Sequence, residues 1–152
     1  MDELQAVVTS TESLQEISVP VQMELTRVVD SDLNDQHWIH LTEVNGSRTF
    51  PIVIGAVESQ ALNRCLLEST PFRPLTHQLL LNIIEALGGQ CEALVINRIK
   101  EHTYYASIQI RAGEKLHEID CRPSDGVVIA VHHSPVLPIF VEEDVLNAVV
   151  GG

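Results

Sequence analysis

The chain has 152 residues and carries 21 acidic against 9 basic side chains, a formal net charge of −12. This length predicts a single domain. Its 45% hydrophobic and 20% charged residues are typical of a globular protein and exclude a disordered one. An acidic surface repels phosphate backbones, which argues against a nucleic-acid binder built on a basic groove. With 3 Phe, 2 Tyr and 1 Trp, the chain also has little material for a platform that stacks nucleobases.

The cysteines and the hydropathy pattern indicate a cellular compartment. Cys65, Cys91 and Cys121 form no CxxC or CxxH pair, so we do not expect a thiolate zinc site. We interpret them as small core residues in a reducing compartment. The acidic N-terminus has no signal-length apolar run, and no stretch approaches the roughly 18 apolar residues of a membrane span. We therefore expect a soluble cytoplasmic protein with no membrane contact.

The first residues differ in composition from the rest of the chain. Residues 1–20 contain four acids, no base and several Ser and Thr. We predict an acidic N-terminal extension over residues 1–20 and one compact domain over residues 21–150.

A β-hairpin is the clearest local feature, after a first strand expected over residues 23–29. Asn45-Gly46 lies between two extended runs, which predicts a hairpin with a type I′ turn. Pro51 then belongs at a sheet edge or a bulge, because it cannot donate to a ladder. The predicted cross-strand pairs are Glu43 with Arg48, Leu41 with Phe50, and Ile39 with Ile52.

Two helices are expected after Gly55, over residues 56–67 and 76–87. Thr76 is the predicted N-cap of the second helix, and Gly88-Gly89 ends it. The predicted buried stripe of the first helix is Val57, Ala61, Leu62, Cys65 and Leu66. The predicted buried stripe of the second is Leu79, Leu80, Ile83, Ile84 and Leu87.

The second half of the chain predicts strands at about 92–99, 104–111 and 115–121, with short polar connections typical of an antiparallel meander. A helix begins at Pro123 and runs to about His133. A short strand over 138–141 and a helix over 142–149 follow. The order predicts an α+β fold, with an antiparallel or mixed β-sheet that has hairpins and is covered by about four helices.

The strongest chemical pattern is Asp120-Cys121-Arg122-Pro123-Ser124-Asp125, where a strand enters a helix. Asp120 and Arg122 share a strand face, and helix N-termini favour anions. Ser124 and Arg122 would hold a phosphate, and Asp120 and Asp125 a hard divalent cation such as Mg²⁺ or Mn²⁺. A purely structural interpretation stays open, because the helix dipole alone favours Asp125 and because Asp120 could pair with Arg122.

A second cluster, Arg73-Pro74-Leu75-Thr76-His77, also leads from a loop into a helix. His77 could act as a general acid or base beside the cationic Arg73. Equally, His77 could pack beside Leu80 and Ile84 as a buried side chain.

Several ordered segments of the chain resemble the bifunctional nuclease domain family over about residues 22–147. Departures from the family pattern occur at Gln78, where Asp is usual, and at Cys121 and Gly126, where Ala is usual. The segments that carry the resemblance are Phe50–Gly55 with Glu58 and Ala61, Arg73–His77 with Leu79 and Leu80, Tyr104–Ala106, Ile119–Asp125, and Pro138–Val141.

The resemblance implies a compact α+β fold, a tendency to oligomerise, and the non-specific DNase and RNase activity reported for plant members. It supplies no catalytic residue set, so the residue roles rest on the patterns above. The first hypothesis is a metal-dependent, non-specific nuclease without an organic cofactor, with nucleic acid as its substrate. Its catalytic residues would be Asp120, Asp125 and His77, and its phosphate-binding residues Arg73, Arg122 and Ser124. The alternative is a non-catalytic regulatory or scaffold domain. In either case we expect a homo-oligomer, most simply a dimer.

Overall fold

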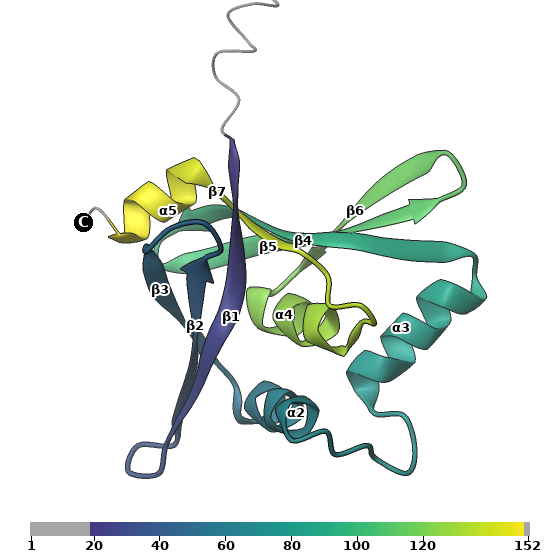
Figure 1. Cartoon of the computed structure of the whole chain (residues 1–152), viewed down its shortest axis with the longest axis horizontal. Helices are drawn as coiled ribbons and strands as arrows, with labels where there is room; N and C mark the ends of the chain where they lie inside the picture. Colours follow the sequence, from purple (N-terminus) through teal and green to yellow (C-terminus); the bar gives the residue numbers. More distant parts are fainter. Residues whose placement is uncertain (1–18, 151–152) are drawn as a thin grey trace, which may run out of the picture.

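The computed structural model describes residues 19–150, so almost all of the predicted extension over residues 1–20 lies outside the described residues. The described part forms seven strands and four helices around one hydrophobic core (Figure 1). In chain order these are β1 (Pro20–Ser31), β2 (Gln36–Glu43), β3 (Thr49–Ile54), α2 (Ala56–Leu66), α3 (Thr76–Ala86), β4 (Gly89–Lys100), β5 (Thr103–Ala112), β6 (Lys115–Cys121), α4 (Pro123–His132), β7 (Ile139–Glu142) and α5 (Glu143–Val150).

The strands form one sheet in the order β3-β2-β1-β7-β4-β5-β6. The short C-terminal strand β7 pairs with β1 on one side and with β4 on the other, so it joins the two halves of the chain. The β4–β7 pair is parallel and the other neighbours are antiparallel. This mixed sheet with four helices confirms the predicted α+β class.

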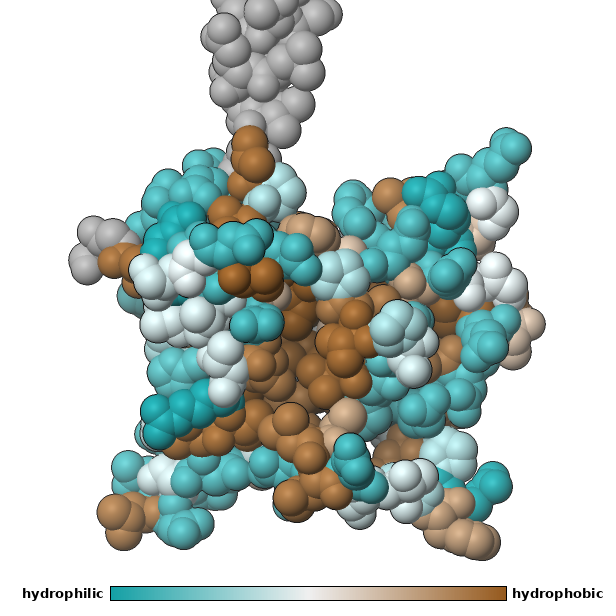
Figure 2. All heavy atoms as spheres, viewed as in Figure 1, coloured by the Kyte–Doolittle hydropathy of each residue, from teal (hydrophilic) through white to brown (hydrophobic). Residues whose placement is uncertain are grey.

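Helix α4 lies at the centre of the molecule. In Figure 1, α2, α3 and α4 lie together on one side of the twisted sheet, while α5 lies apart from them. Side chains around the whole of α4 are buried, including Val127, Val128 and Ile129, as expected of a helix surrounded by protein. Figure 2 shows hydrophobic side chains gathered around α4 in the middle of the face drawn, between hydrophilic margins.

The close approach of α4 to the sheet depends on Gly126. A Cβ atom added at this position would lie 2.4 Å from Cδ1 of Leu94 on β4 and 3.2 Å from Sγ of Cys121. Leu94 is fully buried in a closely packed core, so a methyl group at position 126 would force Leu94 or α4 to shift. Gly126 therefore provides the room that Leu94 fills.

The predicted β2–β3 hairpin is confirmed, but its predicted turn type is wrong. Ile39 pairs with Ile52 and Leu41 with Phe50, and β3 is an edge strand that accommodates Pro51. Neither Asn45 nor Gly46 has the positive φ that a type I′ turn requires. Instead, four residues connect Glu43 to Arg48, and the Glu43 N–H donates to the Arg48 carbonyl at 2.9 Å.

Gly46 is needed for a different reason, namely side-chain packing. A Cβ atom there would lie 2.8 Å from the Glu43 carboxylate. That carboxylate accepts hydrogen bonds from the guanidinium of Arg48, which also donates to Glu143 on α5 at 2.6 Å. The ion pair thus shapes the loop and ties the hairpin to the last helix.

Two-residue turns occur in the second half of the chain. Glu101 and His102 join β4 to β5 with φ values of 51° and 65°, the conformation that a type I′ turn requires. Gly113, with φ of 64°, begins the two-residue turn between β5 and β6. Tight turns at both ends of β5 confirm the predicted antiparallel meander.

The predicted buried faces of α2 and α3 are partly wrong. On α2, Ala61 and Leu62 are buried as expected, but Glu58 and Ser59 are buried in place of Val57 and Leu66. The physical reason is that Ser59 donates a hydrogen bond to Asp30 on β1, and Glu58 meets an arginine described below.

On α3 the apolar stripe faces outward. His77 and Leu81 are its buried residues, and the N-cap is Leu75, without a side-chain hydrogen bond, rather than Thr76. Helical periodicity marks an apolar face correctly, but it does not say whether the face packs inside the chain. The exposed residues of this face are Leu79, Leu80, Ile83 and Leu87.

The strained turn between β4 and β5 gives a stability prediction. Replacing Glu101-His102 by Asn-Gly should raise the free energy of unfolding by about 1 kcal/mol, because these residues tolerate positive φ better. Denaturant unfolding measures the change. Gly113→Ala serves as the opposite control and should lower it by about 1 kcal/mol. A destabilised Asn-Gly variant would contradict the turn assignment.

Candidate functional site

A chain of four polar side chains connects the first turns of three helices. Arg122, the residue before α4, donates from Nε to Oδ2 of Asp125 at 2.9 Å and from Nη2 to Oε1 of Glu58 at 2.7 Å. His77 donates from Nε2 to Oδ1 of Asp125 at 3.0 Å. Glu58 lies in α2, His77 in α3 and Asp125 in α4, so the cluster joins all three.

Local sequence explains why these groups meet. Arg122 is extended at the end of β6, and Pro123 begins α4 without the loss of a hydrogen bond, as predicted. Glu58 and Asp125 lie in first helical turns, where the helix dipole favours a carboxylate. Each acid is therefore stable in its own helix and is also available to the arginine.

Gly55 makes room for one of these acids. It is the N-cap of α2 in an ordinary extended conformation. A Cβ atom at this position would lie 2.5 Å from Oε2 of Glu58. The absence of a side chain at Gly55 thus lets the Glu58 carboxylate fold back against the start of its helix.

The charges in the cluster are unequally exposed. Glu58 is 6% exposed, and a buried carboxylate is costly unless it is paired. Its partner Arg122 keeps 70% of its side chain exposed. Arg122 therefore stabilises a buried charge at one end and presents a cationic group to solvent at the other.

Hydrogen bonding holds Asp125 in its ionised form. Burial acts to raise the pKa of Asp125, but the hydrogen bonds from His77 and Arg122 outweigh it, so the pKa lies below its ordinary value. The same carboxylate raises the pKa of Arg122. With Nε2 of His77 committed to Asp125, Nδ1 is the ring nitrogen that can exchange a proton with a ligand.

These side chains border a cavity of about 680 Å³ between α3, α4 and strands β5 and β6. One end is charged and includes Asp120 on β6, whose carboxylate makes no hydrogen bond or ion pair with the residues that the structure describes. The other end is apolar. The side chains that line this apolar end include Leu80, Ile84, Ile108, Ile110 and Ile119.

Cys121 also lines this cavity but is not a nucleophile. Burial, with the nearby Asp120 and Asp125 charges, raises the pKa of its thiol to about 11. The thiol is protonated at neutral pH, and thiols react as thiolates. Along with Cys65 and Cys91, it is free of any disulfide.

The structure brings together four of the six predicted site residues. Asp120, Arg122, Asp125 and His77 border the 680 Å³ cavity. Ser124 is buried beside them in α4 and does not line it, while Arg73 lines a neighbouring cavity. Glu58 was absent from the predicted set, although it stands in the first segment of the family resemblance, which was the one signal that marked it.

The donor set fits a weakly held divalent cation better than a preassembled metal centre. In the part of the chain that the structure describes, no group of three or more His, Cys, Asp or Glu side chains could hold a metal ion. Mg²⁺ often binds through one or two carboxylates, with water and substrate oxygens completing its shell. Asp120 offers one such carboxylate, whereas metal binding by Asp125 requires replacement of a hydrogen bond from His77 or Arg122.

A model of the bifunctional nuclease domain matches residues 39–150, which include every side chain of the cluster. The chain belongs to this family. The match confirms the resemblance inferred from the ordered sequence segments. None of the helices in the described residues is long and apolar enough to span a membrane.

Two relatives are uncharacterized proteins of Mycobacterium tuberculosis, from strains CDC 1551 and H37Rv. Each is 40% identical over 106 residues, which cover 70% of this chain and 62% of the relative. The match thus spans less than two thirds of those proteins, and neither name assigns an activity.

The paired and unpaired aspartates give a prediction for stability and its pH dependence. Asp125→Asn should lower the free energy of unfolding at pH 7 by about 2 kcal/mol, because it removes charge from two hydrogen bonds. Asp120→Asn, the matched control, should change it by less than about 0.5 kcal/mol.

The pH dependence has a definite sign. The folded-state pKa of Asp125 lies below its ordinary value of 3.8, so its contribution is present above that pH and is lost as the pH falls through the folded-state value. The stability difference between wild type and Asp125→Asn should therefore shrink toward pH 3. Denaturant unfolding at pH 7, 5 and 3 measures it, and a difference that grows with acid would contradict the assigned ionisation.

Proposed function

We propose that this protein is a non-specific nuclease that hydrolyses phosphodiester bonds at the charged end of the 680 Å³ cavity. The observation that carries the proposal is the hydrogen-bonded chain from Glu58 through Arg122 and Asp125 to His77, beside the uncommitted carboxylate of Asp120. Membership of the bifunctional nuclease domain family supports it.

Each side chain has a defined task in this proposal. Arg122, anchored by two carboxylates, presents its remaining N–H groups to a phosphate oxygen and stabilises negative charge that develops there. Asp125 fixes the orientation of His77, whose Nδ1 accepts a proton from the attacking water or returns one to the leaving oxygen. The apolar end of the cavity, with Leu80 and Ile108, gives a nucleoside a dry surface.

A divalent cation fits the proposal at Asp120. Mg²⁺ or Mn²⁺ bound there would polarise the phosphate and acidify a water molecule. It would also offset the repulsion between a phosphate and a chain of net charge −12. The proposal needs no organic cofactor. We also propose a cytoplasmic location for the protein, because a reducing compartment keeps thiols such as these free.

Cleavage assays test the proposal directly. The wild type should cut single-stranded and duplex DNA and RNA in Mg²⁺ or Mn²⁺ and lose activity in EDTA. His77→Ala, Asp120→Asn and Arg122→Gln should each reduce the rate by about 100-fold or more. Arg111→Gln is the matched control, because Arg111 also pairs with a carboxylate, Glu92 at 2.8 Å, and lines neither cavity.

A wild type that cuts none of these substrates with either metal would remove the nuclease proposal. Full activity in Asp120→Asn would remove the assigned cation site. Melting temperatures of all variants show whether a lost activity is a lost fold.

A second candidate function is a non-catalytic oligomeric regulatory or scaffold domain. The mutual pairing of Glu58, Arg122 and Asp125 favours it, because such a network also fixes the relative positions of three helices. The outer face of α3 favours it too. On this face, which consists of Leu79, Ile83 and Leu87, side chains are 45% to 81% exposed. Contiguous apolar surface of this kind marks interaction sites.

Both candidates include a homo-oligomer, and we place its interface on the outer face of α3. A face of this kind buries itself most simply against a second copy in a closed two-fold dimer. Sedimentation at micromolar concentration should give twice the 16.8 kDa chain mass. The double variant Leu79→Glu with Ile83→Glu should sediment with the mass of a single chain. Leu33→Glu, at a 94% exposed position away from α3, should leave the dimer intact. A wild type that sediments as a monomer would contradict the interface.

A further inference from the structure

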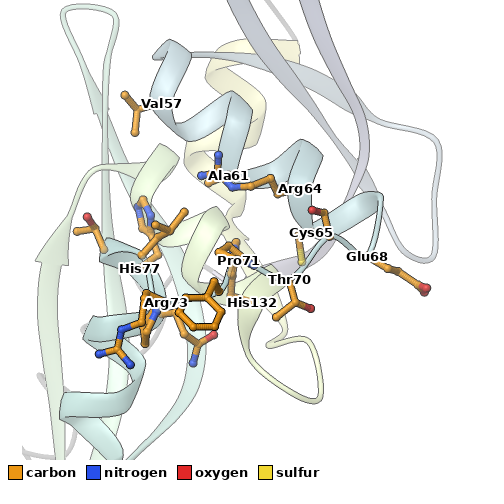
Figure 3. A pocket seen from close by; sticks show the side chains of 16 residues that line it. Val57, Ala61, Arg64, Cys65, Glu68, Thr70, Pro71, Arg73, His77 and His132 are labelled. Atoms are coloured by element: carbon orange, nitrogen blue, oxygen red, sulfur yellow. The ribbon is translucent and has the colours of Figure 1, made fainter.

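A second cavity adjoins the candidate site. It has a volume of about 590 Å³ and lies between α2, the loop that leads to α3, and the end of α4 (Figure 3). Val57, Thr76 and His77 line both cavities, so the two meet at the proposed catalytic imidazole. A ligand that occupies both cavities therefore lies across His77.

The charge of this cavity is opposite to that of the chain. Arg64 on α2 and Arg73 in the loop line it together with His77 and His132, and Glu68 is the one carboxylate among its lining residues. In Figure 3 the side chain of Arg64 extends from α2 along one border of the pocket, and that of Arg73 lies at the opposite border. A concentration of cationic groups in a chain of net charge −12 favours an anionic ligand.

The two arginines have no acidic partner among the described residues. Within residues 19–150, Arg48, Arg111 and Arg122 make ion pairs with carboxylates, whereas Arg27 and Arg98, which line neither cavity, do not. Arg64 and Arg73 make no ion pair with the described part of the chain, although 21 acids are available in the sequence. Unpaired guanidinium groups at a concave surface are suited to phosphate, which they bind through two parallel hydrogen bonds.

His132 adds a further polar atom. Its Nδ1 donates to the Val128 carbonyl at 2.8 Å, which leaves Nε2 available to a ligand. The rings of His132 and His77 lie 6.5 Å apart between centroids, so the imidazoles are neighbours at the junction of the cavities. Phe72 completes the lining with a ring that is 99% exposed, a large apolar surface open to stacking.

We propose that this second cavity is a subsite for single-stranded nucleic acid, in which Arg64 and Arg73 bind backbone phosphates adjacent to the one at His77 and Phe72 stacks on a base. This inference rests on the proposed function in one respect, the identity of the polymer that crosses His77. Stacking on Phe72 requires a base that is not already stacked in a duplex, so the subsite selects a single strand. The subsite also provides a cationic surface at which a phosphate backbone can bind to an otherwise acidic protein.

Binding without cleavage tests this subsite. Fluorescein-labelled dT10 and the same strand in a duplex are titrated with protein in EDTA, and anisotropy is followed across a salt series. The wild type should bind dT10 at least about 10-fold more tightly than the duplex. Arg64→Gln and Arg73→Gln should each weaken dT10 binding by about 10-fold. Each should also reduce the slope of log affinity against log salt by about 0.7.

Matched variants separate stacking from charge. Phe72→Ala should weaken dT10 binding by about 10-fold without change in the salt slope, because a base stack releases no counterion. Arg27→Gln, at an exposed position of β1 that lines neither cavity, should change neither quantity. Melting temperatures of the four variants should match the wild type.

The outcomes distinguish this subsite from the nuclease proposal. Binding of dT10 that depends on Arg64 and Arg73, in a protein that cleaves nothing, supports the subsite and removes the nuclease. If the wild type cleaves nucleic acid, and Arg64→Gln and Arg73→Gln both bind dT10 with the wild-type affinity and salt slope, the subsite is overturned and the nuclease proposal stands. A wild type that does not bind dT10, or binds the duplex equally well, overturns the subsite.

Discussion

The carboxylate of Asp125 is the group on which the site depends. Its two oxygens accept hydrogen bonds from different elements, one from His77 in α3 and the other from Arg122 at the start of α4. Arg122 in turn neutralises the buried Glu58 of α2. One carboxylate thus connects α3 to Arg122 and, through Arg122, to α2, at the border of the cavity that lies between these helices and β6.

The sheet supplies the frame for this arrangement. β7, near the end of the chain, lies between β1 and β4, so the first and second halves of the sequence form one sheet only when the C-terminal strand is in place. The same strand leads directly into α5, where Glu143 accepts from Arg48 of the first hairpin. Contacts between residues distant in sequence therefore close the fold.

The sequence predicted those features that residues close together in the chain determine. The alternation around Asn45-Gly46 was enough to pair Ile39 with Ile52, because a one-residue slip would expose every core side chain of β3. The turn type was not predictable in the same way, since the Glu43–Arg48 ion pair, and not backbone preference, determines the loop. The type I′ turn formed instead at Glu101-His102, which has no glycine to signal it.

The candidate site shows the same limit. Asp120, Arg122 and Asp125 were found because they are adjacent in sequence, and His77 because an imidazole near a helix start is conspicuous. Glu58 has an ordinary local explanation as a first-turn acid, so only tertiary packing reveals that it is buried against Arg122. Likewise, the apolar period of α3 could not disclose that Leu79 and Ile83 face away from the core.

The contact between Gly126 and Leu94 has a consequence for how the family can vary. Gly126 stands where the family pattern usually has alanine, and the Leu94 side chain occupies the volume that the missing methyl group would take. The two positions therefore share one fixed volume at the centre of the core. An alanine at position 126 requires Leu94 to shift or to be replaced by a smaller residue, so substitutions at these two positions should be coupled among relatives.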